Sequence, residues 1–450
     1  MKTSLIILAA GMGTRMNSEI PKVLHAIAGD PMLVHAMAAG AMLEPEHTIV
    51  VAGHGAAEVT AAAHAYDETA TVVVQAEQQG TAQAVDQAKE ALAGFDGTAI
   101  VLYGDTPFVS PDTLERMMEA AATVDVVVLG FEAADPGRYG RLVMHGDTLE
   151  RIVEFKDASE AERAITLCNS GVIACNAALL FDLIAAVDNK NASGEYYLTD
   201  IIGLARTRGL TATAVTCDEA ETLGVNSRAQ LADAEAAFQT RARAILLEDG
   251  VTLQAPETVY LARDTIIGRD TVIEPNVVFG PGVTVESGAL IRAFSHLEGC
   301  HVSRGAVVGP YARLRPGAEL EENTRVGNFV EIKNAVIAEG AKVNHLSYIG
   351  DAFVGARANI GAGTITCNYD GVMKHHTHIG AGAFIGSNTM LVAPVHIGNG
   401  AMTGSGSVIT SDVDADALAL ARAPQVEKPG MARKLRDILK AKKAKSQRSI

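Results

Sequence analysis

The chain has 450 residues, no tryptophan and a formal net charge of −16. This length suffices for two or three domains with a sizeable core. The negative charge argues against nucleic-acid or membrane binding, and no run is apolar and long enough to span a membrane. The five cysteines are scattered and lack a C-x-x-C pair, which favours reduced thiols in the cytoplasm over disulfides or zinc.

The N-terminal segment, MKTSLIILAAG, has the lysine and the apolar stretch of a signal peptide. The stretch is short, however, and leads directly into a glycine-rich turn and patterned sequence. We therefore interpret it as the first buried strand of a domain.

The turn that follows is LAAGMGTRM, residues 8–16. It is not a dinucleotide fingerprint, because Met16 stands where G-x-G-x-x-G needs its third glycine, and it lacks the Lys-Ser/Thr pair of a Walker A loop. Small residues at Gly11 and Gly13 allow backbone N–H groups to approach an anion, and Arg15 and Lys22 add positive charge. The turn alone is equally compatible with a phosphate loop and with a plain strand-to-helix turn.

Apolar runs typical of strands alternate with helix-like stretches up to about residue 225. Strands are predicted at 48–53, 71–76, 98–105 and 124–132, and helices at 81–94 and 110–121, the latter with Ser110 and Pro111 as cap and first turn. This alternation predicts an α/β domain with a mostly parallel sheet and helices on both faces. Ligands bind beyond the carboxyl ends of such strands, where the glycine turn and YGDTP (103–107) both lie.

Two further helices are predicted. Residues 227–247 form an amphipathic pattern with Ser227 as cap, which we interpret as a linker helix. The last twenty residues, 431–450, are locally basic and are predicted to be a solvated helix or a frayed tail.

After about residue 255 the sequence changes to a six-residue period, with glycine often following the aliphatic position. The repeated positions are Ile267, Ile273, Phe279, Val285, Ile291, Leu297, Val302, Val308, Leu314, Leu320, Val326, Ile332, Ile337, Val343, Ile349, Val354, Ile360, Ile379, Ile385, Leu391, Ile397, Thr403 and Ile409. Hexapeptide repeats of this kind predict a parallel β-helix whose aliphatic residues stack inward. Its flat faces favour self-association, and the break at 364–378 predicts an extruded loop.

These two halves together resemble a known family. A LAAGMGTRM half followed by repeats containing RPGA, NFVEIKN, NHLSYIGD and NIGAGTITCNYDG closely resembles the bacterial bifunctional N-acetylglucosamine-1-phosphate uridylyltransferase/glucosamine-1-phosphate N-acetyltransferases. The resemblance implies a Rossmann-like nucleotidyltransferase domain (1–226), a linker helix (227–250) and a left-handed parallel β-helix acetyltransferase domain with a basic tail (251–450). It also implies a cytoplasmic homotrimer that makes UDP-N-acetylglucosamine for cell-wall biosynthesis.

For the first half, the resemblance implies that UTP and N-acetylglucosamine 1-phosphate react to give UDP-N-acetylglucosamine and pyrophosphate. Positioning and charge neutralisation supply catalysis in such phosphoryl transfers. The implied substrate-binding residues are Leu8, Ala9, Ala10, Gly11, Gly13, Arg15, Lys22, Gln75, Gln79, Gly80, Thr81, Tyr103, Gly104, Gly140, Glu154, Asn169, Tyr197 and Thr199. The implied Mg²⁺ ligands are Asp105 and Asn226, whose hard oxygen donors suit that ion.

For the second half, the resemblance implies acetyl transfer from acetyl-CoA to the amine of glucosamine 1-phosphate. His345 stands at the position of the base that takes the amine proton. The implied sugar-phosphate residues are Arg315, Lys333, Tyr348, Asn359, Asn368 and Tyr369, and the implied acetyl-CoA residues are Ala362, Ser387, Ser405 and Arg422. Neighbouring subunits of the trimer share this pocket in the family, so we expect the monomer to lack acetyltransferase activity.

The chain departs from the family pattern at Asn344, Ser347 and Ser405, which places local hydrogen bonding in question. A narrower alternative keeps only nucleotidyl transfer to another sugar 1-phosphate, with a β-helix that oligomerises or regulates. A non-enzymatic trimeric scaffold is a further alternative. The cluster of His345, Tyr348 and the CNYDG loop argues against the first, and the set of Gly13, Lys22 and Asp105 argues against the second.

Overall fold

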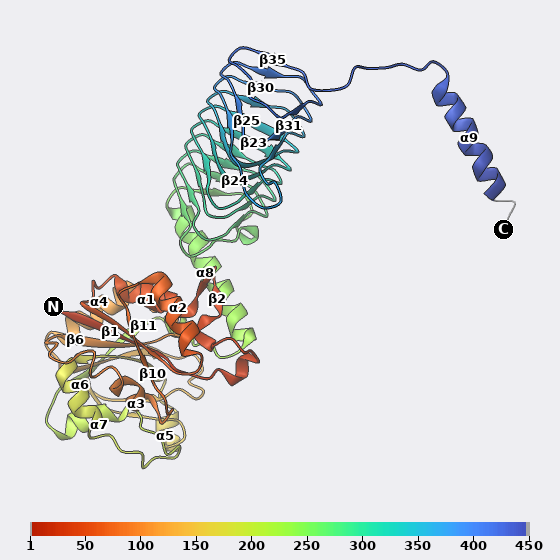
Figure 1. The fold of residues 1–450 in the computed structure, drawn as a ribbon. Helices are drawn as coiled ribbons and strands as arrows, with labels where there is room; N and C mark the ends of the chain where they lie inside the picture. The colour runs from red at the N-terminus through yellow and green to blue at the C-terminus, as the bar shows by residue number, and fades with distance from the viewer. Residues whose placement is uncertain (1, 447–450) are drawn as a thin grey trace. The chain divides into compact units, whose positions relative to one another are not determined.

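The computed structural model describes residues 2–446 (Figure 1). Two compact units are present. The first contains the residues up to Glu248 together with Tyr260–Thr265 and Phe279–Pro281. The second contains Asp249–Val259, Ile266–Val278 and the residues from Gly282 onward.

A nine-stranded sheet forms the centre of the first unit, and its main path runs β11-β7-β10-β6-β1-β4-β5. Only β10 runs antiparallel to its neighbours on this path, so the predicted mostly parallel sheet is confirmed. The strands are β1 (Thr3–Ala9), β4 (His47–Ala52), β5 (Thr71–Val74), β6 (Thr98–Tyr103), β7 (Val126–Glu132), β8 (Arg141–His145), β9 (Thr148–Val153), β10 (Leu167–Asn176) and β11 (Ala212–Cys217).

Helices cover both faces of this sheet (Figure 1). Alternate residues of β1 explain why, because Leu5 and Ile7 pack toward one face and Ile6 and Leu8 toward the other, each into a separate apolar cluster. One cluster includes side chains of α1 (Met32–Ala41), α2 (Ala56–Tyr66) and α4 (Pro111–Ala121). The other includes side chains of α3 (Thr81–Asp86), α6 (Ala177–Ile184) and α7 (Asp200–Thr207).

Short elements complete the first unit. These are the turns η1 (Thr14–Met16), η2 (Lys22–Leu24) and η3 (Glu219–Thr222), the hairpin of β2 (Ala26–Ile27) and β3 (Asp30–Pro31), and α5 (Glu160–Arg163).

The two helices predicted from local signals have different outcomes. The Ser110 hydroxyl accepts the Thr113 N–H at 3.2 Å, which caps α4 where the sequence predicts. The helix predicted over 81–94 is shorter than expected, because α3 ends at Asp86. Beyond it the N–H groups of residues 87–89 bond to carbonyls three residues earlier, and this tighter turning ends the α-helix.

The long helix α8 (Arg228–Glu248) starts after Ser227, whose hydroxyl accepts the Gln230 N–H at 3.3 Å. Its Leu231 and Phe238 pack on a small apolar cluster that includes Ile27 and Met32. The helix predicted as a linker is therefore part of the first unit. None of the helices in the described range is both long and apolar enough to cross a membrane.

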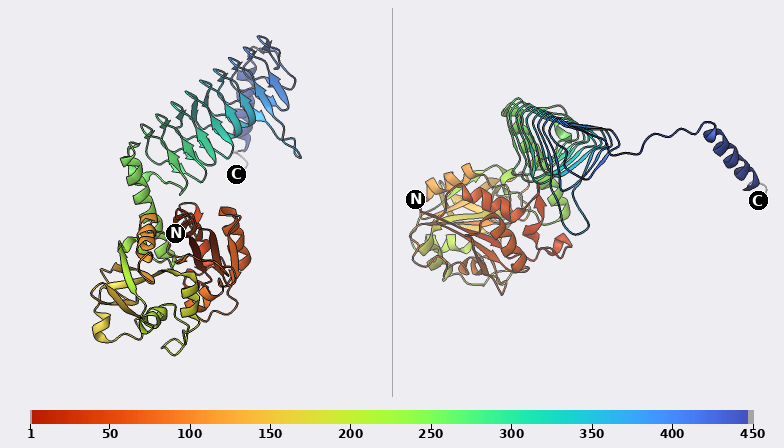
Figure 2. Two further views of the ribbon diagram at one scale, coloured as in Figure 1. Left: turned by 90° about the vertical axis from the view of Figure 1, so that its left-hand side faces the viewer. Right: turned by 45° about the horizontal axis from the view of Figure 1, so that its top comes forward.

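The second unit is a parallel β-helix of short strands, whose coils form a triangle when viewed end-on (Figure 2, right). Most strands pair with one that lies 17 or 18 residues later, as Leu290 pairs with Val307 and Val307 with Arg325. Three six-residue units thus make one coil, and a 17-residue coil accounts for each slip of the sequence period. All the repeated positions named above, from Ile267 to Ile409, are buried, as the sequence predicts.

The strands of the β-helix form two ladders after the turn η4 (Pro256–Thr258). The first contains β12 (Thr252–Leu253), β14 (Val272–Ile273), β17 (Leu290–Ile291), β20 (Val307–Val308), β23 (Arg325–Asn328), β25 (Lys342–His345), β27 (Asn359–Ile360), β30 (Phe384–Ile385), β33 (Met402–Thr403) and β35 (Leu418–Ala419). The second is branched and contains β13 (Ile266–Ile267), β15 (Val278–Phe279), β16 (Thr284–Val285), β18 (His296–Leu297), β19 (Cys300–Val302), β21 (Arg313–Leu314), β22 (Ala318–Leu320), β24 (Glu331–Ile337), β26 (Tyr348–Val354), β28 (Ile365–Cys367), β29 (Thr377–Ile379), β31 (Met390–Val392), β32 (Val395–Ile397) and β34 (Val408–Ile409).

One coil is longer than the others. Asn359 pairs with Phe384, a step of 25 residues, and the extra residues leave the prism as a loop closed by an antiparallel bridge between Tyr369 and Lys374. The extruded loop predicted within 364–378 is thus confirmed. The basic tail forms the exposed helix α9 (Met431–Ser446), as predicted, and its last four residues lie outside the described range.

Candidate active sites

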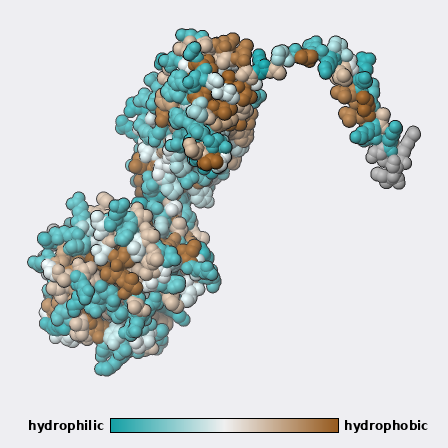
Figure 3. Space-filling view, viewed as in Figure 1, coloured by the Kyte–Doolittle hydropathy of each residue, from teal (hydrophilic) through white to brown (hydrophobic). Residues whose placement is uncertain are grey.

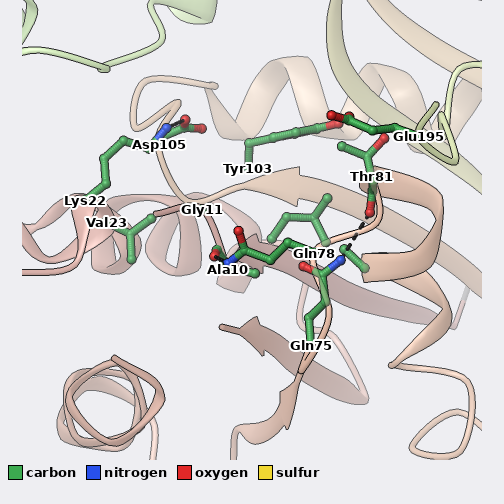
Figure 4. Close-up of a pocket in the computed structure, with 13 residues that line it drawn as sticks. Ala10, Gly11, Lys22, Val23, Gln75, Gln78, Thr81, Tyr103, Asp105 and Glu195 are labelled. Carbon is green, nitrogen blue, oxygen red and sulfur yellow. Dashed lines mark hydrogen bonds and ion pairs between the residues drawn. The ribbon is translucent and has the colours of Figure 1, made fainter. Parts of the chain in front are cut away.

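A cavity of about 330 Å³ opens at the carboxyl ends of β1, β5 and β6 (Figure 4). Nine residues of the predicted uridylyltransferase set line it, namely Leu8, Ala10, Gly11, Lys22, Gln75, Gly80, Thr81, Tyr103 and Asp105. Because these strands are neighbours in the sheet, their loops converge on one place although the segments lie far apart in the sequence.

One glycine of the first loop, Gly13, is required by the loop's geometry. Gly13 has φ +61°, and a Cβ there would lie 2.6 Å from the Lys22 Cβ. The loop can therefore approach Lys22 closely only with glycine at this position. Gln78 donates to the Ala10 carbonyl at 2.6 Å and ties the loop to the segment after β5 (Figure 4). Arg15, in contrast, is exposed and does not line the cavity.

The Lys22 ammonium lies between the two predicted Mg²⁺ ligands. Its Nζ contacts Asp105 Oδ2 and lies 3.0 Å from Asn226 Oδ1 (Figure 4 shows the contact with Asp105). Asn226 reaches this place because the Val225 N–H donates to the Asp105 carbonyl at 2.9 Å and the Gln230 side chain accepts the Asn226 N–H at 2.9 Å. A cation thus bridges two oxygen donors from distant segments of the first unit.

The segment after β5 forms the wall opposite Lys22. The buried Gln75 side chain donates to the Gly80 carbonyl at 3.2 Å and contacts the Gln83 side-chain oxygen. At Gly80, φ is +128° and a Cβ would lie 2.4 Å from the Tyr196 carbonyl oxygen. Glycine here lets the 195–197 segment close against the cavity, which brings Glu195 into its lining.

The predicted sugar-binding residues form a second group. The Glu154 carboxylate accepts the Thr199 hydroxyl at 3.2 Å and stands beside Gly140, whose carbonyl accepts the Asn169 N–H at 2.9 Å. Burial raises the pKa of Glu154, an effect that the Thr199 hydrogen bond partly offsets. Tyr197 lies nearby, in the electrostatic reach of Glu154.

Tyr103 connects this group to the cavity. Burial raises the pKa of its phenol, and the carboxylates of Asp105 and Glu154 add to that effect, while Thr81 hydrogen-bonds it. Asp200 lies in the same acidic surroundings. Burial and the charges of Asp188, Glu154 and Asp157 raise the pKa of Asp200 to about 6. Negative charge therefore concentrates where an uncharged sugar ring is expected, while Lys22 lies at the phosphate end.

In the β-helix, the predicted base and the predicted acetyl-CoA residues lie along one edge. The backbone bonds from Gly363 N to His345 O (3.2 Å), from Asn388 N to Ala362 O (2.7 Å) and from Gly406 N to Ser387 O (2.8 Å) stack these positions in successive coils. At the end of the edge, the Arg422 guanidinium donates to the Ser405 carbonyl at 2.6 Å. His345 is exposed there, and its Nδ1 lies 2.7 Å from Asn328 Oδ1.

Cations gather on the adjoining face. Arg315 pairs with Glu331, with a separation of 2.9 Å between Nη1 and Oε1. Lys333 lies beside Lys374 of the extruded loop, and this neighbouring charge lowers the pKa of Lys374. Two adjacent ammonium groups repel each other unless an anion lies between them, so the face is suited to binding a phosphate.

Asp351 anchors this face. Its carboxylate accepts the side-chain amides of Asn334, at 2.6 Å, and Asn368. Burial alone would raise the pKa of Asp351, but these amides, together with Lys374 and Lys333, lower it. Asn368 also donates to the Tyr348 hydroxyl at 3.4 Å, so it bridges the extruded loop to β26.

Two predicted residues are placed less closely. The Tyr369 hydroxyl donates to the Gly371 carbonyl of its own loop at 2.7 Å. Asn359 is the register partner of Lys342 in the preceding coil. Lys342 and His345 both belong to β25, so Asn359 lies in the same ladder as His345.

Comparisons with known proteins agree with both halves of this architecture. Residues 5–171 match the MobA-like NTP transferase domain, and residues 264–299 and 376–411 match the bacterial transferase hexapeptide repeat family. The chain is 70% identical over 448 residues to the bifunctional protein GlmU of Roseobacter denitrificans, with 100% of both chains covered. It is 74% identical to that of Ruegeria pomeroyi over 448 residues, again with 100% of both chains covered. The chain belongs to the bifunctional GlmU family.

Membership of the GlmU family confirms the prediction of two activities, uridylyl transfer and acetyl transfer in UDP-N-acetylglucosamine synthesis, over the single-activity and scaffold alternatives. One of the three departures from the family pattern is explained by its side chain. The Ser347 hydroxyl donates to the His345 carbonyl at 2.8 Å, which secures the backbone of the base. Asn344 and Ser405 make their contacts with Gly327 and Arg422 through backbone carbonyls, so the structure does not explain their side chains.

Several residues beside the GlmU-type sites are missed by sequence reasoning. Asn328 lies inside the NFVEIKN motif, and Gln78 and Glu195 stand one and two residues before the named Gln79 and Tyr197, so motif extension would have found them. Lys374 has no such signal, because its place beside Lys333 depends on how the extruded loop folds back.

Proposed function

We propose that each unit carries one of the two reactions, uridylyl transfer in the 330 Å³ cavity and acetyl transfer at the His345 edge of the β-helix. The observation that carries the first assignment is the Lys22 ammonium between Asp105 and Asn226. It places a cation where the negative charge of a triphosphate and of its metal ligands must be balanced.

In the uridylyl reaction, a phosphate oxygen of N-acetylglucosamine 1-phosphate attacks the α-phosphorus of UTP in line. The bond from that phosphorus to the bridging oxygen breaks, and pyrophosphate leaves. The loop of residues 8–13 presents backbone N–H groups to the triphosphate, and Lys22 neutralises its charge within the cavity. Arg15, exposed outside the cavity, is left to contact phosphate oxygens that extend beyond it. Gln75 and the 79–81 segment bind the uracil, and the Glu154 group holds the sugar hydroxyls.

Asp105 and Asn226 fit a magnesium ion. Both donors are hard oxygens, and the Lys22 ammonium between them acts as a stand-in cation. Among the described residues, no three His, Cys, Asp or Glu side chains converge on one point, which suits an ion that takes few protein ligands and several phosphate or water oxygens. When bound, Mg²⁺ would be held by Asp105 and Asn226 and would reduce the negative charge of the phosphates.

In the acetyl reaction, His345 accepts a proton from the ammonium of glucosamine 1-phosphate. The freed amine nitrogen forms a bond to the thioester carbonyl carbon, and the carbon–sulfur bond breaks. A second proton of that nitrogen passes to the departing sulfur, so CoA leaves as the thiol, and the His345 imidazolium releases its proton to solvent. Arg315, Lys333 and Lys374 hold the sugar phosphate, and Tyr348, Asn359, Asn368 and Tyr369 hold the ring. The edge through Ala362, Ser387 and Ser405 holds CoA, with Arg422 toward its phosphates.

The active assembly is a homotrimer in the cytoplasm. A column of half-exposed apolar side chains supports self-association, because Phe294, Tyr311 and Phe329 stack with ring centroids 5.0 and 5.3 Å apart and Leu346 continues the line beside His345. All four have positive φ, a conformation that bulky residues rarely adopt. Figure 3 shows further apolar surface on the last coils, where Phe384, Met402 and Val408 are exposed. The five cysteines are free thiols, as the cytoplasm favours.

The assembly is tested with Phe294→Asp and Tyr311→Asp combined, two stacked residues of the column that are not adjacent in sequence to Asn328 or His345. Sedimentation velocity should show monomers, acetyl transfer should be lost, and uridylyl transfer should persist. Active monomers would contradict the shared pocket. Because Asp at these corners removes apolar area without touching His345, the comparison separates assembly from chemistry.

The two reactions are tested together in one tube. Pure protein is incubated with glucosamine 1-phosphate, acetyl-CoA, UTP and Mg²⁺, and the products are identified by mass. UDP-N-acetylglucosamine, CoA and pyrophosphate are expected. A product that forms only from ready-made N-acetylglucosamine 1-phosphate would contradict the acetyl assignment.

A further inference from the structure

We propose that Asn328 is a positioning residue for His345, whose imidazole it holds in the tautomer that leaves Nε2 free to take the proton of the substrate amine. The inference rests on the acetyl transfer proposed above for this edge. It assigns a role to a residue that does not itself touch the reacting atoms.

The contact between the two side chains determines which ring nitrogen carries the proton. Asn328 Oδ1 lies 2.7 Å from His345 Nδ1. An amide oxygen only accepts hydrogen bonds, so Nδ1 must donate and therefore carries the hydrogen. In a neutral imidazole the other nitrogen then holds the lone pair. His345 is exposed apart from this contact, so Nε2 is accessible to a substrate at the edge.

The backbone fixes the two residues opposite each other. Asn328 and His345 are register partners in β23 and β25, and the Leu346 N–H donates to the Asn328 carbonyl at 3.0 Å. The preceding residue, Gly327, has no Cβ because one would lie 2.0 Å from the Asn344 carbonyl oxygen. Glycine thus permits an unusually close approach of the two coils immediately before the Asn328–His345 pair. Both side chains start from rigid positions, which suits a group that must orient a ring.

An asparagine at this position suits a base better than a carboxylate. A carboxylate beside Nδ1 would stabilise the protonated imidazolium, and an imidazolium has no lone pair with which to accept the amine proton. The neutral amide orients the ring without that penalty. Arg325 and Lys342, the charged side chains on the same two strands, are unchanged in the variants below and cancel in every comparison.

Kinetics with variants of Asn328 test the proposal. In Asn328→Ala, kcat for acetyl transfer should fall about 10- to 100-fold, as is usual when the partner that orients a functional imidazole is removed. The KM for glucosamine 1-phosphate should stay within about twofold, because Asn328 lies outside the proposed phosphate clamp. In Asn328→Asp, the acid limb of the pH–rate profile should move up by about one pH unit, with most of the rate retained at higher pH. A residue that only stabilised the coil would not move that limb.

A spectroscopic readout tests the tautomer directly. ¹⁵N-labelled histidine in the full-length protein should show His345 protonated at Nδ1, with the signal identified by its absence in His345→Gln. In Asn328→Ala the proton should shift toward Nε2. Asn399→Ala serves as the matched control, since it removes an asparagine bond to the Ala381 N–H elsewhere in the β-helix and should leave kcat, the pH profile and the His345 signal unchanged.

The outcomes separate this inference from the proposed function. Wild-type kcat and an unshifted pH profile in both Asn328 variants, or an Nδ1 without a proton in the wild type, would overturn the role of Asn328. Absence of acetyl transfer in the wild type would instead overturn the proposed function. Uridylyl transfer reports folding in each variant, and if Asn328→Ala fails to fold, Asn328→Asp decides by its pH profile, because it retains an oxygen acceptor.

Discussion

In the first unit, the residues around the cavity come from segments as distant as Gly11, Gln75, Glu195 and Asn226, whereas in the β-helix the proposed site repeats along one edge of adjacent coils. The first site exists only because loops at the ends of neighbouring strands converge. The second is built on a ladder in which each position stands one coil from the next, 17 or 18 residues except across the 25-residue coil that carries the extruded loop.

This difference has a consequence for how each site responds to change. Close contacts between segments, such as those of Gly13 with Lys22 and Gly80 with Tyr196, hold the first site together, so a substitution in one segment displaces groups from another. The edge of the β-helix is held by regular backbone bonds, so side chains there can be replaced singly with little effect on their neighbours. The sensitive part of this second site is instead the edge as a whole, which is exposed to solvent in a single chain.

The largest expected effect is that of Asp105→Ala on the cavity. In the proposed site, loss of the Asp105 carboxylate removes the ligand that would hold Mg²⁺ against the phosphates, and uridylyl transfer should fall by about 10³- to 10⁵-fold. Acetyl transfer measured by CoA release should be unchanged. Parallel loss of both activities in folded protein would show that the two sites are not independent.

The corresponding change in the β-helix is His345→Ala. Removal of a general base typically costs about 10²- to 10⁴-fold, and this loss should appear in the kcat of acetyl transfer alone. Uridylyl transfer from supplied N-acetylglucosamine 1-phosphate is the control. Acetyl transfer at the wild-type rate would place the base elsewhere.

The cations beside Asp351 should have a smaller effect, because they bind substrate in both the ground and transition states. Lys333→Ala and Lys374→Ala should each raise the KM for glucosamine 1-phosphate by about 10-fold or more, the equivalent of one charge-assisted hydrogen bond. Initial-rate kinetics measure this. Lys428→Ala, in the exposed segment before α9, is a matched control with no expected effect.

A variant of Lys22 tests whether this lysine competes with a metal ion for the space between Asp105 and Asn226. The Lys22 ammonium occupies this space, so Lys22→Gln should tighten the binding of Mn²⁺ without nucleotide by about tenfold, through loss of a competing positive charge. Titration followed by electron paramagnetic resonance detects free Mn²⁺ directly. Unchanged or weaker binding would mean that the lysine does not compete with the metal.

The smallest expected effect concerns stability. Because the folded-state pKa of Asp200 is raised to about 6, folding favours its protonated form, and stability is lost as the pH rises from about 4 through 6. Asp200→Asn should therefore stabilise the first unit at pH 7 by about 1 kcal/mol, after discounting for solvent screening, and should have no effect at pH 3.5. Calorimetry at the two pH values measures this. An equal gain at both would contradict burial as the cause.

Much of the fold follows from local and periodic features of the sequence. The apolar residues from Ile267 to Ile409 predict the β-helix because each coil buries its own repeat against identical neighbours, so sequence spacing translates directly into position. The Ser110 cap and the strand at residues 3–9 are likewise determined by local hydrogen bonding and continuous apolar character. After Asp86 the local pattern still favours a helix, but the chain turns more tightly and the α-helix ends earlier than the pattern predicts.

Tertiary structure alone decides the rest. No spacing relates Lys22 to Asn226, which meet only because the start of α8 bonds back to the Asp105 loop. Glu195 reaches the cavity through the close approach at Gly80, and Lys374 reaches Lys333 through the fold of an irregular loop. Repeats and caps depend on interactions between residues that are near in sequence or in regular register. The contacts of Lys22, Glu195 and Lys374 depend instead on how distant segments pack, and that packing is decided only when the whole chain folds.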